Sequence, residues 1–251
     1  MIQNKIFGLI GNPIKHSYSK IFFEEKFSRL NLINYRYNLF ELQSLTELST
    51  LIKNTPTLQG FNVTSPYKVD IMRYLDFISM DAKTIGAVNT ILLHNGLLYG
   101  YNTDMIGFVK SLQEETTIEN IHSALILGTG GAAKAVLQGL KKYNILCTIV
   151  SRKPSTDNNI ISYEELNNMQ DFSLFDIIIN ATPCGMETYP KETEMDANKI
   201  NSKQIVYDLI YNPNKTTLLH IAEQKGCKII NGLKMLHYQA EASWKIWNTN
   251  E

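Results

Sequence analysis

The sequence is poor in cysteine, with three in 251 residues. Cys147, Cys184 and Cys227 are far apart and lack the spacing of metal ligands, which excludes a disulfide-rich scaffold and a zinc module. An excess of either charge is also missing, because 24 basic side chains balance 24 acidic ones. Nothing in the composition therefore indicates binding to nucleic acid or to an anionic membrane, and a small molecule is the expected partner.

Long hydrophobic runs are missing as well. The opening stretch MIQNKIFGLIG has too short an apolar run for a signal peptide, and no later segment approaches the length of a membrane span. These absences predict a cytoplasmic protein, and both a monomer and a homodimer stay open as its oligomeric state. The histidines show no metal spacing, so we expect no metal and assign surface or structural roles to His16, His94, His122, His220 and His237.

Strand-like and helix-like segments alternate in the first part of the chain. KIFGLIG is followed by an amphipathic helix from Ile21 to Leu30, by YRYNLF, by a helix near Leu45 to Lys53, and by GFNVT. Such alternation predicts a mostly parallel sheet covered by helices. Asn95-Gly96 between two apolar runs then predicts a β-hairpin that closes this unit, and a helix is expected from Asp104 to Glu115.

The alternation resumes after the polar segment EETTIENIHS, which has the composition of a boundary. ALILG, a helix from Ala132 to Tyr143, CTIVSR, DIIINA, QIVYDLI, a helix from Lys215 to Gln224 and KII follow in order. We therefore predict a two-domain α/β protein. A substrate-binding domain is expected at residues 1–103, joined by a C-terminal helix at 233–251, and a Rossmann-type nucleotide-binding domain at 104–232.

A glycine-rich turn marks the expected nucleotide site. GTGGAA matches G-x-G-x-x-A between a strand and a helix, and it comprises Gly128, Thr129, Gly130, Gly131, Ala132 and Ala133. The first glycine permits a tight turn, the second admits a pyrophosphate, and the helix N-terminus attracts its charge. The alternative is a merely tight strand-to-helix turn.

The end of the next strand indicates which dinucleotide binds. NAD sites usually place an acidic residue there for the ribose 2′-hydroxyl, whereas CTIVSRK ends in Ser151, Arg152 and Lys153. Two cations suit a 2′-phosphate, so NADP is favoured over NAD. A pair of exposed charges on a loop is the alternative.

Polar residues gather where the strands of the first domain are expected to end. Lys68 is the last residue of TSPYK, a rigid turn that would hold it in one place. The alternative is that Lys68 is a solvated charge, as a lysine past a strand end usually is. Ser17 and Ser19 follow the first strand, where one of them could simply cap a helix. Asn89, Asn102, Thr103 and Asp104 complete the set, with Asp104 also interpretable as a helix N-cap. Together they suit a small, hydroxyl-rich acid.

The order and spacing of these motifs resemble the shikimate dehydrogenase family. The resemblance spans the chain through GNPIKHSYS, GFNVTSPYK, GAVNT, YNTD, GTGGAA, YDLIYNPNKT and NGLKMLHYQA. It implies reversible, NADP-dependent reduction of 3-dehydroshikimate to shikimate, a step of aromatic amino-acid biosynthesis. A quinate/shikimate dehydrogenase that uses NAD, and a catalytically silent homologue that only binds ligands, are the alternatives.

The same resemblance assigns roles to single residues. Lys68 and Asp104 would form the catalytic pair, with Lys68 transferring the proton. The substrate would be bound by Ser17, Ser19, Thr64, Asn89, Asp104, Tyr211 and Gln239. The cofactor would be bound by Gly128 to Ala132, by Ser151, Arg152, Lys153 and Thr156, and by Leu209 and Gly232.

Some residues depart from the family pattern. Lys20 stands where the family usually has proline, and Met105 stands where it usually has glycine. Ser151 and Lys153 replace the usual asparagine and threonine, and Thr156 replaces a frequent cation, which weakens the expected binding of the 2′-phosphate without removing it.

Overall fold

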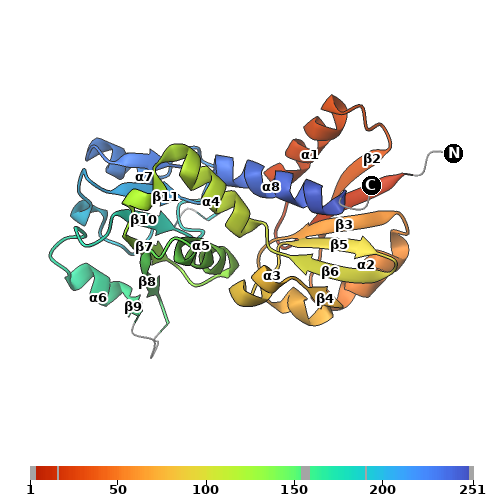
Figure 1. The fold of residues 1–251 in the computed structure, drawn as a ribbon, viewed down its shortest axis with the longest axis horizontal. Coiled ribbons are helices and arrows are strands. Elements are labelled where there is room, and N and C mark those ends of the chain that lie inside the picture. The colour runs from red at the N-terminus through yellow and green to blue at the C-terminus, as the bar shows by residue number, and fades with distance from the viewer. Residues whose placement is uncertain (1–3, 16, 154–158, 190, 249–251) are drawn as a thin grey trace. The chain divides into compact units, whose positions relative to one another are not determined.

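The computed structural model describes residues 4–15, 17–153, 159–189 and 191–248, which form two compact units (Figure 1). The first unit comprises Met1–Gly107 and His237–Glu251, and the second comprises Phe108–Leu236. Both limits fall inside a helix, in α4 (Asp104–Glu115) and in α8 (Leu233–Trp247). The predicted boundaries stand at the starts of these two helices.

The first unit contains a mixed, six-stranded sheet with the strand order β2-β1-β3-β5-β6-β4. The three strands β2, β1 and β3 are parallel, β5 runs antiparallel to β3 and β6, and β4 is parallel to β6. The strands are β1 (Lys5–Gly11), β2 (Tyr35–Glu41), β3 (Leu58–Val63), β4 (Phe77–Ile78), β5 (Thr90–His94) and β6 (Leu97–Tyr101). The helices are α1 (Tyr18–Arg29), α2 (Leu48–Asn54) and α3 (Met80–Ile85), with 3₁₀ turns η1 (Leu45–Glu47) and η2 (Asp70–Tyr74).

The hairpin between β5 and β6 has the geometry that its sequence predicts. Asn95 and Gly96 both have positive φ angles, 52° and 77°. A two-residue turn of this kind matches the right-handed twist of the flanking strands, and asparagine and glycine tolerate it best. The prediction of a hairpin at this position is confirmed.

An aromatic cluster joins the C-terminal helix α8 to the sheet of the first unit. Trp247 stacks on Phe7 with ring centroids 4.8 Å apart, and its indole N–H donates to the Ile91 carbonyl at 2.9 Å. The β3 strand passes so close to this ring that a Cβ on Gly60 would lie 2.4 Å from Trp247 Nε1. Only glycine at this position lets α8 lie directly on the sheet.

The second unit is built on an all-parallel sheet with the order β9-β8-β7-β10-β11-β12. Counted within this unit, the order is 3-2-1-4-5-6, the arrangement of dinucleotide-binding domains. The strands are β7 (Ser123–Leu127), β8 (Leu146–Ser151), β9 (Ile160–Ser162), β10 (Ile177–Asn180), β11 (Ile205–Asp208) and β12 (Lys228–Ile230). The helices, besides α4 and α8, are α5 (Gly131–Lys141), α6 (Tyr163–Asn168) and α7 (Thr217–Gln224), with 3₁₀ turns η3 (Ile118–Asn120) and η4 (Ala197–Lys199).

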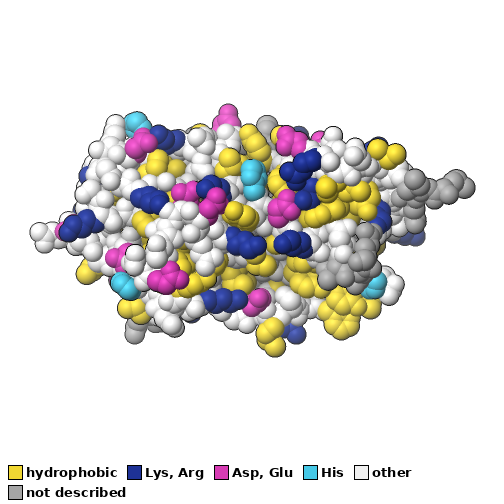
Figure 2. Space-filling view, turned by 45° about the horizontal axis from the view of Figure 1, so that its top comes forward, with side chains coloured by type: hydrophobic (Ala, Val, Ile, Leu, Met, Phe, Trp, Pro, Cys, Tyr) yellow, Lys and Arg dark blue, Asp and Glu magenta, His cyan; other side chains and the backbone are white. Residues whose placement is uncertain are grey.

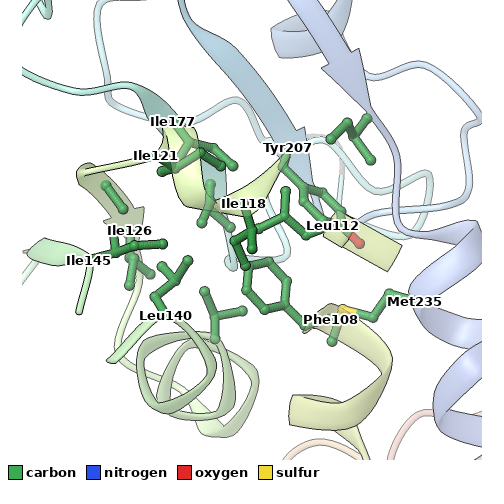
Figure 3. Close-up of a cluster of buried hydrophobic side chains, with 14 of the residues drawn as sticks. Phe108, Leu112, Ile118, Ile121, Ile126, Leu140, Ile145, Ile177, Tyr207 and Met235 are labelled. Carbon is green, nitrogen blue, oxygen red and sulfur yellow. The ribbon is translucent and has the colours of Figure 1, made fainter. Parts of the chain in front are cut away.

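Helices α4 and α5 cover one face of this sheet with apolar side chains. Figure 3 shows Phe108 and Leu112 of α4 gathered with Leu140 of α5 and the strand residue Ile126, all of them fully buried. Each such side chain contributes roughly 1.5–3 kcal/mol through burial. Tyr207 lies in the same cluster, where burial raises the pKa of its hydroxyl and a hydrogen bond to Ser111 at 2.7 Å provides its partner.

The sequence does not predict four of the short elements, namely α3, α6, β4 and β9. The helices α3 and α6 have six residues each, and β4 and β9 have two and three, too few for a periodic pattern. A signal for α6 is nevertheless present, because Ser162 and Glu165 form a capping box at its start.

The surface agrees with the neutral composition. Basic and acidic side chains are interspersed over the face seen in Figure 2, without a large field of one sign. No helix within the described part of the chain combines the length and the apolar character that crossing a bilayer would require.

Candidate active site

The turn after β3 holds Lys68 in place, as the sequence predicts. Tyr67 donates its backbone N–H to the Thr64 carbonyl at 3.0 Å and its hydroxyl to the Leu42 carbonyl at 2.7 Å. On the other side, the Val88 N–H donates to the Lys68 carbonyl at 2.7 Å. The Lys68 side chain is only 18% exposed, so it is not a solvated surface charge.

Lys68 is paired with Asp104, the first residue of α4. Lys68 Nζ lies 2.6 Å from Asp104 Oδ2, and the Asp104 side chain is 7% exposed. Asp104 is not the helix cap, because Asn102 Oδ1 accepts the Met105 N–H at 3.2 Å and takes that role. Asp104 is therefore free to bond side chains, while the helix N-terminus favours its negative charge.

Asn89 bonds the second oxygen of Asp104. Its Nδ2 donates to Asp104 Oδ1 at 2.8 Å, and its Oδ1 accepts the backbone N–H of Thr103 at 2.7 Å. The backbone N–H can only donate, so it fixes which end of the amide faces the carboxylate. Lys68, Asp104 and Asn89 thus form one oriented chain of hydrogen bonds.

Helix α8 brings two further polar groups to this chain. Gln239 and Ser243 are one turn apart on the helix and share a face with Trp247. Asn89 Nδ2 lies 3.4 Å from Gln239 Oε1, and Ser243 Oγ lies 2.8 Å from Thr90 Oγ1. Packing of the C-terminal helix on the sheet therefore decides where these two side chains stand.

A fully buried hydroxyl cluster supports Asn89 from behind. Thr90, Thr103 and Ser243 have no exposed surface, and their hydroxyl oxygens lie 2.8–3.2 Å apart. Ser243 donates to the Gln239 carbonyl at 3.0 Å, so its oxygen accepts the Asn62 amide at 2.9 Å. A buried polar network that is satisfied in this way holds its members in one arrangement.

The network continues to Ser19 at the start of α1. Asn62 Oδ1 accepts the Tyr37 hydroxyl at 2.8 Å. Burial raises the pKa of Tyr37 well above its usual value, and a hydrogen bond from the Ser19 side chain acts in the opposite direction. Ser17 caps α1 by accepting the Ser19 N–H at 3.3 Å, which uses its oxygen and leaves its O–H as a donor.

The first unit thus brings together most of the predicted substrate residues. Hydrogen bonds link Lys68 to Asp104, Asp104 to Asn89 and Asn89 to Gln239, and Thr64 begins the turn that carries Lys68. Ser19 joins through Tyr37 and Asn62, two residues that the sequence prediction omits. The polar residues that it missed are Tyr37, Asn62, Thr90 and Ser243; an asparagine inside the apolar strand GFNVT was the available signal.

The glycine-rich turn in the second unit lies between β7 and α5, beside β10, where the strand order reverses. Gly128 has a φ of 105°, which favours glycine. Gly130 is the N-cap of α5 and supplies no side-chain cap, and a Cβ built on it would meet nothing within 4 Å. No side chain caps the start of α5, and the space beside Gly130 is open, which suits the approach of a pyrophosphate to a helix N-terminus.

The end of β8 carries the residues expected at the adenosine end of the cofactor. Ser151 is buried, and its hydroxyl accepts the Lys153 N–H at 3.1 Å. Arg152 and Lys153 are exposed. Thr156, predicted at the same site, lies outside the described residues. The residues present fit a phosphorylated ribose better than a free 2′-hydroxyl.

The exit of β11 places Leu209 and Gly232 next to each other. A Cβ on Gly232 would lie 1.9 Å from the Leu209 carbonyl oxygen, and the Gly232 N–H donates to the Ile210 carbonyl at 3.0 Å. Tyr211 follows in the same loop, within the second unit. In the part of the chain that the structure describes, no group of three or more His, Cys, Asp or Glu could hold a metal ion.

Comparison with known proteins agrees with the geometry of both units. The family model "Shikimate dehydrogenase substrate binding domain" matches residues 9–91. A "Shikimate dehydrogenase (NADP(+))" from Methanococcus maripaludis strain C6 is 43% identical over 263 residues, which cover 98% of this chain and 92% of that protein. The chain belongs to the shikimate dehydrogenase family.

Solved structures of this family share the whole fold. Shikimate dehydrogenase 1 from Peptoclostridium difficile has a TM-score of 0.87 and 40% identity, covering 98% of this chain and 92% of that one. Shikimate 5-dehydrogenase from Thermus thermophilus, in complex with NADP(H) and shikimate, has a TM-score of 0.84 and 28% identity, covering 98% and 94%. The predicted family and the two-domain α/β fold are confirmed.

Proposed function

We propose that the chain catalyses the reversible reduction of 3-dehydroshikimate to shikimate with NADP(H), as a step of aromatic amino-acid biosynthesis. The observation that carries the proposal is the Lys68–Asp104 pair, 2.6 Å apart and bonded to Asn89, in a member of this family. The names of the similar proteins support both the reaction and the cofactor.

The first unit supplies the groups that hold a hydroxyl-rich acid. Ser17 and Ser19 at the start of α1 bind the carboxylate, where the helix N-terminus adds a positive field. Thr64, Asn89, Asp104 and Gln239 bond the ring hydroxyls, and Tyr211 adds a further substrate contact. The support for these roles is positional: four of the residues belong to one buried hydrogen-bond network.

Lys68 moves the proton. In the reduction direction its ammonium donates to the oxygen that becomes the hydroxyl, and in oxidation its amine takes that proton back. Asp104 holds the ammonium through Oδ2 and is itself oriented by Asn89 through Oδ1. When bound, NADP(H) supplies or accepts the hydride at C4 of its nicotinamide.

The second unit holds the cofactor. Gly128 to Ala132 bind the pyrophosphate through backbone N–H groups, and Ser151, Arg152, Lys153 and Thr156 bind the phosphorylated adenosine. Leu209 and Gly232 would hold the nicotinamide end of the cofactor. We extend the proposal to a reducing, cytoplasmic location, which the three free cysteines support. The oligomeric state, monomer or homodimer, stays a prediction.

The decisive experiment compares initial rates with shikimate and quinate, each with NADP⁺ and NAD⁺, by the absorbance of the reduced cofactor. The proposal expects shikimate with NADP⁺ to give the highest kcat/KM. A preference for quinate with NAD⁺ would identify the quinate/shikimate enzyme instead. Thermal stabilisation by both ligands without turnover would identify a silent binding protein.

A further inference from the structure

A buried carboxylate in the second unit has no part in the function proposed above. Asp208 is the last residue of β11 and is fully buried. Its Oδ1 accepts the Asn180 side-chain amide and the Ile210 N–H, both at 3.0 Å, and its Oδ2 accepts the Thr216 hydroxyl at 2.7 Å. These donors come from three different places at the carboxyl edge of the sheet.

The bond to Asn180 reaches the glycine-rich turn. Asn180 ends β10, and its Oδ1 accepts both the N–H and the hydroxyl of Thr182, at 3.1 and 2.6 Å. Thr182 lies against the glycine-rich turn, since a Cβ on Gly128 would be 3.0 Å from its methyl group. The loop after β10 is thereby tied to Asp208 on one side and packed on Gly128 on the other.

The other two bonds fix the loop after β11. The Ile210 N–H is bonded to Asp208, while the Ile210 carbonyl accepts the Gly232 N–H. Thr216, which donates to Asp208, also caps α7 at the far end of this loop. The segment that carries Leu209 and Tyr211 is therefore held at both ends by one carboxylate.

We propose that Asp208 is a positioning residue for the dinucleotide, because it fixes the loops after β10 and β11 beside the glycine-rich turn. This inference rests on the proposed function of the second unit. Asp208 does not touch the cofactor. It sets the places of groups that do.

The charge state of Asp208 gives the inference a pH dependence. Burial raises the pKa of Asp208 to about 6, although the hydrogen bonds from Thr216, Ile210 and Asn180 lower it. The negative charge of Glu192 raises the pKa further. All three partners donate to Asp208, which suits the ionised form. Protonation of Oδ2 makes the Thr216 hydroxyl turn from donor to acceptor and weakens the bonds accepted at Oδ1, so cofactor affinity should weaken as the pH falls through about 6.

Asp176 at the opposite edge of the same sheet is the matched control. Burial alone would raise the pKa of Asp176, but hydrogen bonds from the His122 N–H and from the Ser123 N–H and hydroxyl lower it overall. Asp176 Oδ2 accepts them at 2.7–3.0 Å. Asp176 thus fixes backbone at the amino ends of the strands, as Asp208 fixes the loops at their carboxyl ends, and it lies away from the glycine-rich turn.

The test measures the Kd of NADPH by fluorescence between about pH 5 and pH 8 in the wild type, Asp208→Asn, Asp208→Ala and Asp176→Asn. Asp208→Ala should raise the Kd roughly tenfold or more. Asp208→Asn should weaken binding less and should show a smaller pH step than the wild type, because the amide does not titrate and only the 2′-phosphate, whose second pKa is about 6, still does. Asp176→Asn should keep both the wild-type Kd and the step.

Hydrogen exchange provides a readout that needs no cofactor. In Asp208→Ala the Ile210 amide loses its acceptor and should lose protection, whereas in Asp176→Ala the amides of His122 and Ser123 should lose it. Unchanged NADPH binding in both Asp208 variants, or equal weakening in Asp176→Asn, would overturn the inference. A wild type that fails to bind NADPH would instead overturn the proposed function, while the exchange experiment still reports whether Asp208 orders the loop.

Discussion

In the first unit the proposed site is made of side chains that bond one another. Lys68, Asp104 and Asn89 meet through charged and amide groups, and Thr90 and Ser243 hold them from behind. In the second unit the proposed cofactor site is mainly backbone. Its central groups are the backbone N–H donors at the start of α5, where no side chain provides a cap and the space beside Gly130 is open.

This difference predicts opposite sensitivities. A site of side chains fails when polar atoms are removed, since their buried partners are left unsatisfied. A site of backbone N–H groups fails when atoms are added, because a Cβ takes the space of the ligand. The following substitutions test whether the two units differ in this way.

Gly130→Ala is expected to raise KM for NADP⁺ by roughly tenfold or more, because a methyl group stands where the pyrophosphate approaches. The backbone φ of −72° is accessible to alanine, and a Cβ at this position meets no protein atom within 4 Å, so the melting temperature should change little. Steady-state kinetics and thermal unfolding measure the two effects.

Gly8→Ala, in β1 of the first unit, is the control for this substitution. Its Cβ would lie 2.6 Å from the Asn38 carbonyl oxygen, so the loss should be one of folding stability. If Gly130→Ala unfolded the protein and kept its affinity for NADP⁺, the turn after β7 would have only a structural role.

Arg152→Ala should raise KM for NADP⁺ about tenfold and leave KM for NAD⁺ and for shikimate almost unchanged, because only the 2′-phosphate contact is lost. The exposed position of Arg152 at the end of β8 limits the effect, and Lys153 compensates in part. Lys203 is another exposed cation of the same unit, and Lys203→Ala should leave the KM for NADP⁺, for NAD⁺ and for shikimate unchanged. Equal weakening of both cofactors would show that Arg152 does not recognise the 2′-phosphate.

Ser243→Ala should lower kcat only a few-fold and destabilise the fold by about 1–3 kcal/mol, since Asn62 loses a buried acceptor and Thr90 a partner. Ser111→Ala makes the matched comparison: Ser111 is equally buried and bonded to Tyr207, but belongs to the core of the second unit. It should lose similar stability and keep kcat. If both variants kept a normal kcat, Ser243 would have no role in positioning Asn89 for catalysis.

The sequence predicts the parts of both sites that follow a local rule. The Asn95-Gly96 hairpin, the glycine-rich turn and the placement of Lys68 after a rigid turn all depend on neighbouring residues. The buried cluster does not, because Thr90, Asn62 and Ser243 are single polar residues in apolar segments that meet only through tertiary packing. The same holds for Asp208, whose partners Asn180 and Thr216 come from other parts of the sheet edge.

The central claim is that Lys68 and Asp104 act as one unit in proton transfer, and a double-mutant cycle tests it most directly. Lys68→Ala should lower kcat by roughly 10²-fold or more with little change in KM for shikimate, and Asp104→Asn should lower kcat and raise KM. The double variant should have nearly the kcat of Lys68→Ala, because the second substitution removes a partner of a group already lost. The account would be contradicted if the fold-losses in kcat of the two single variants multiplied in the double variant, or if Asp104→Asn kept full activity.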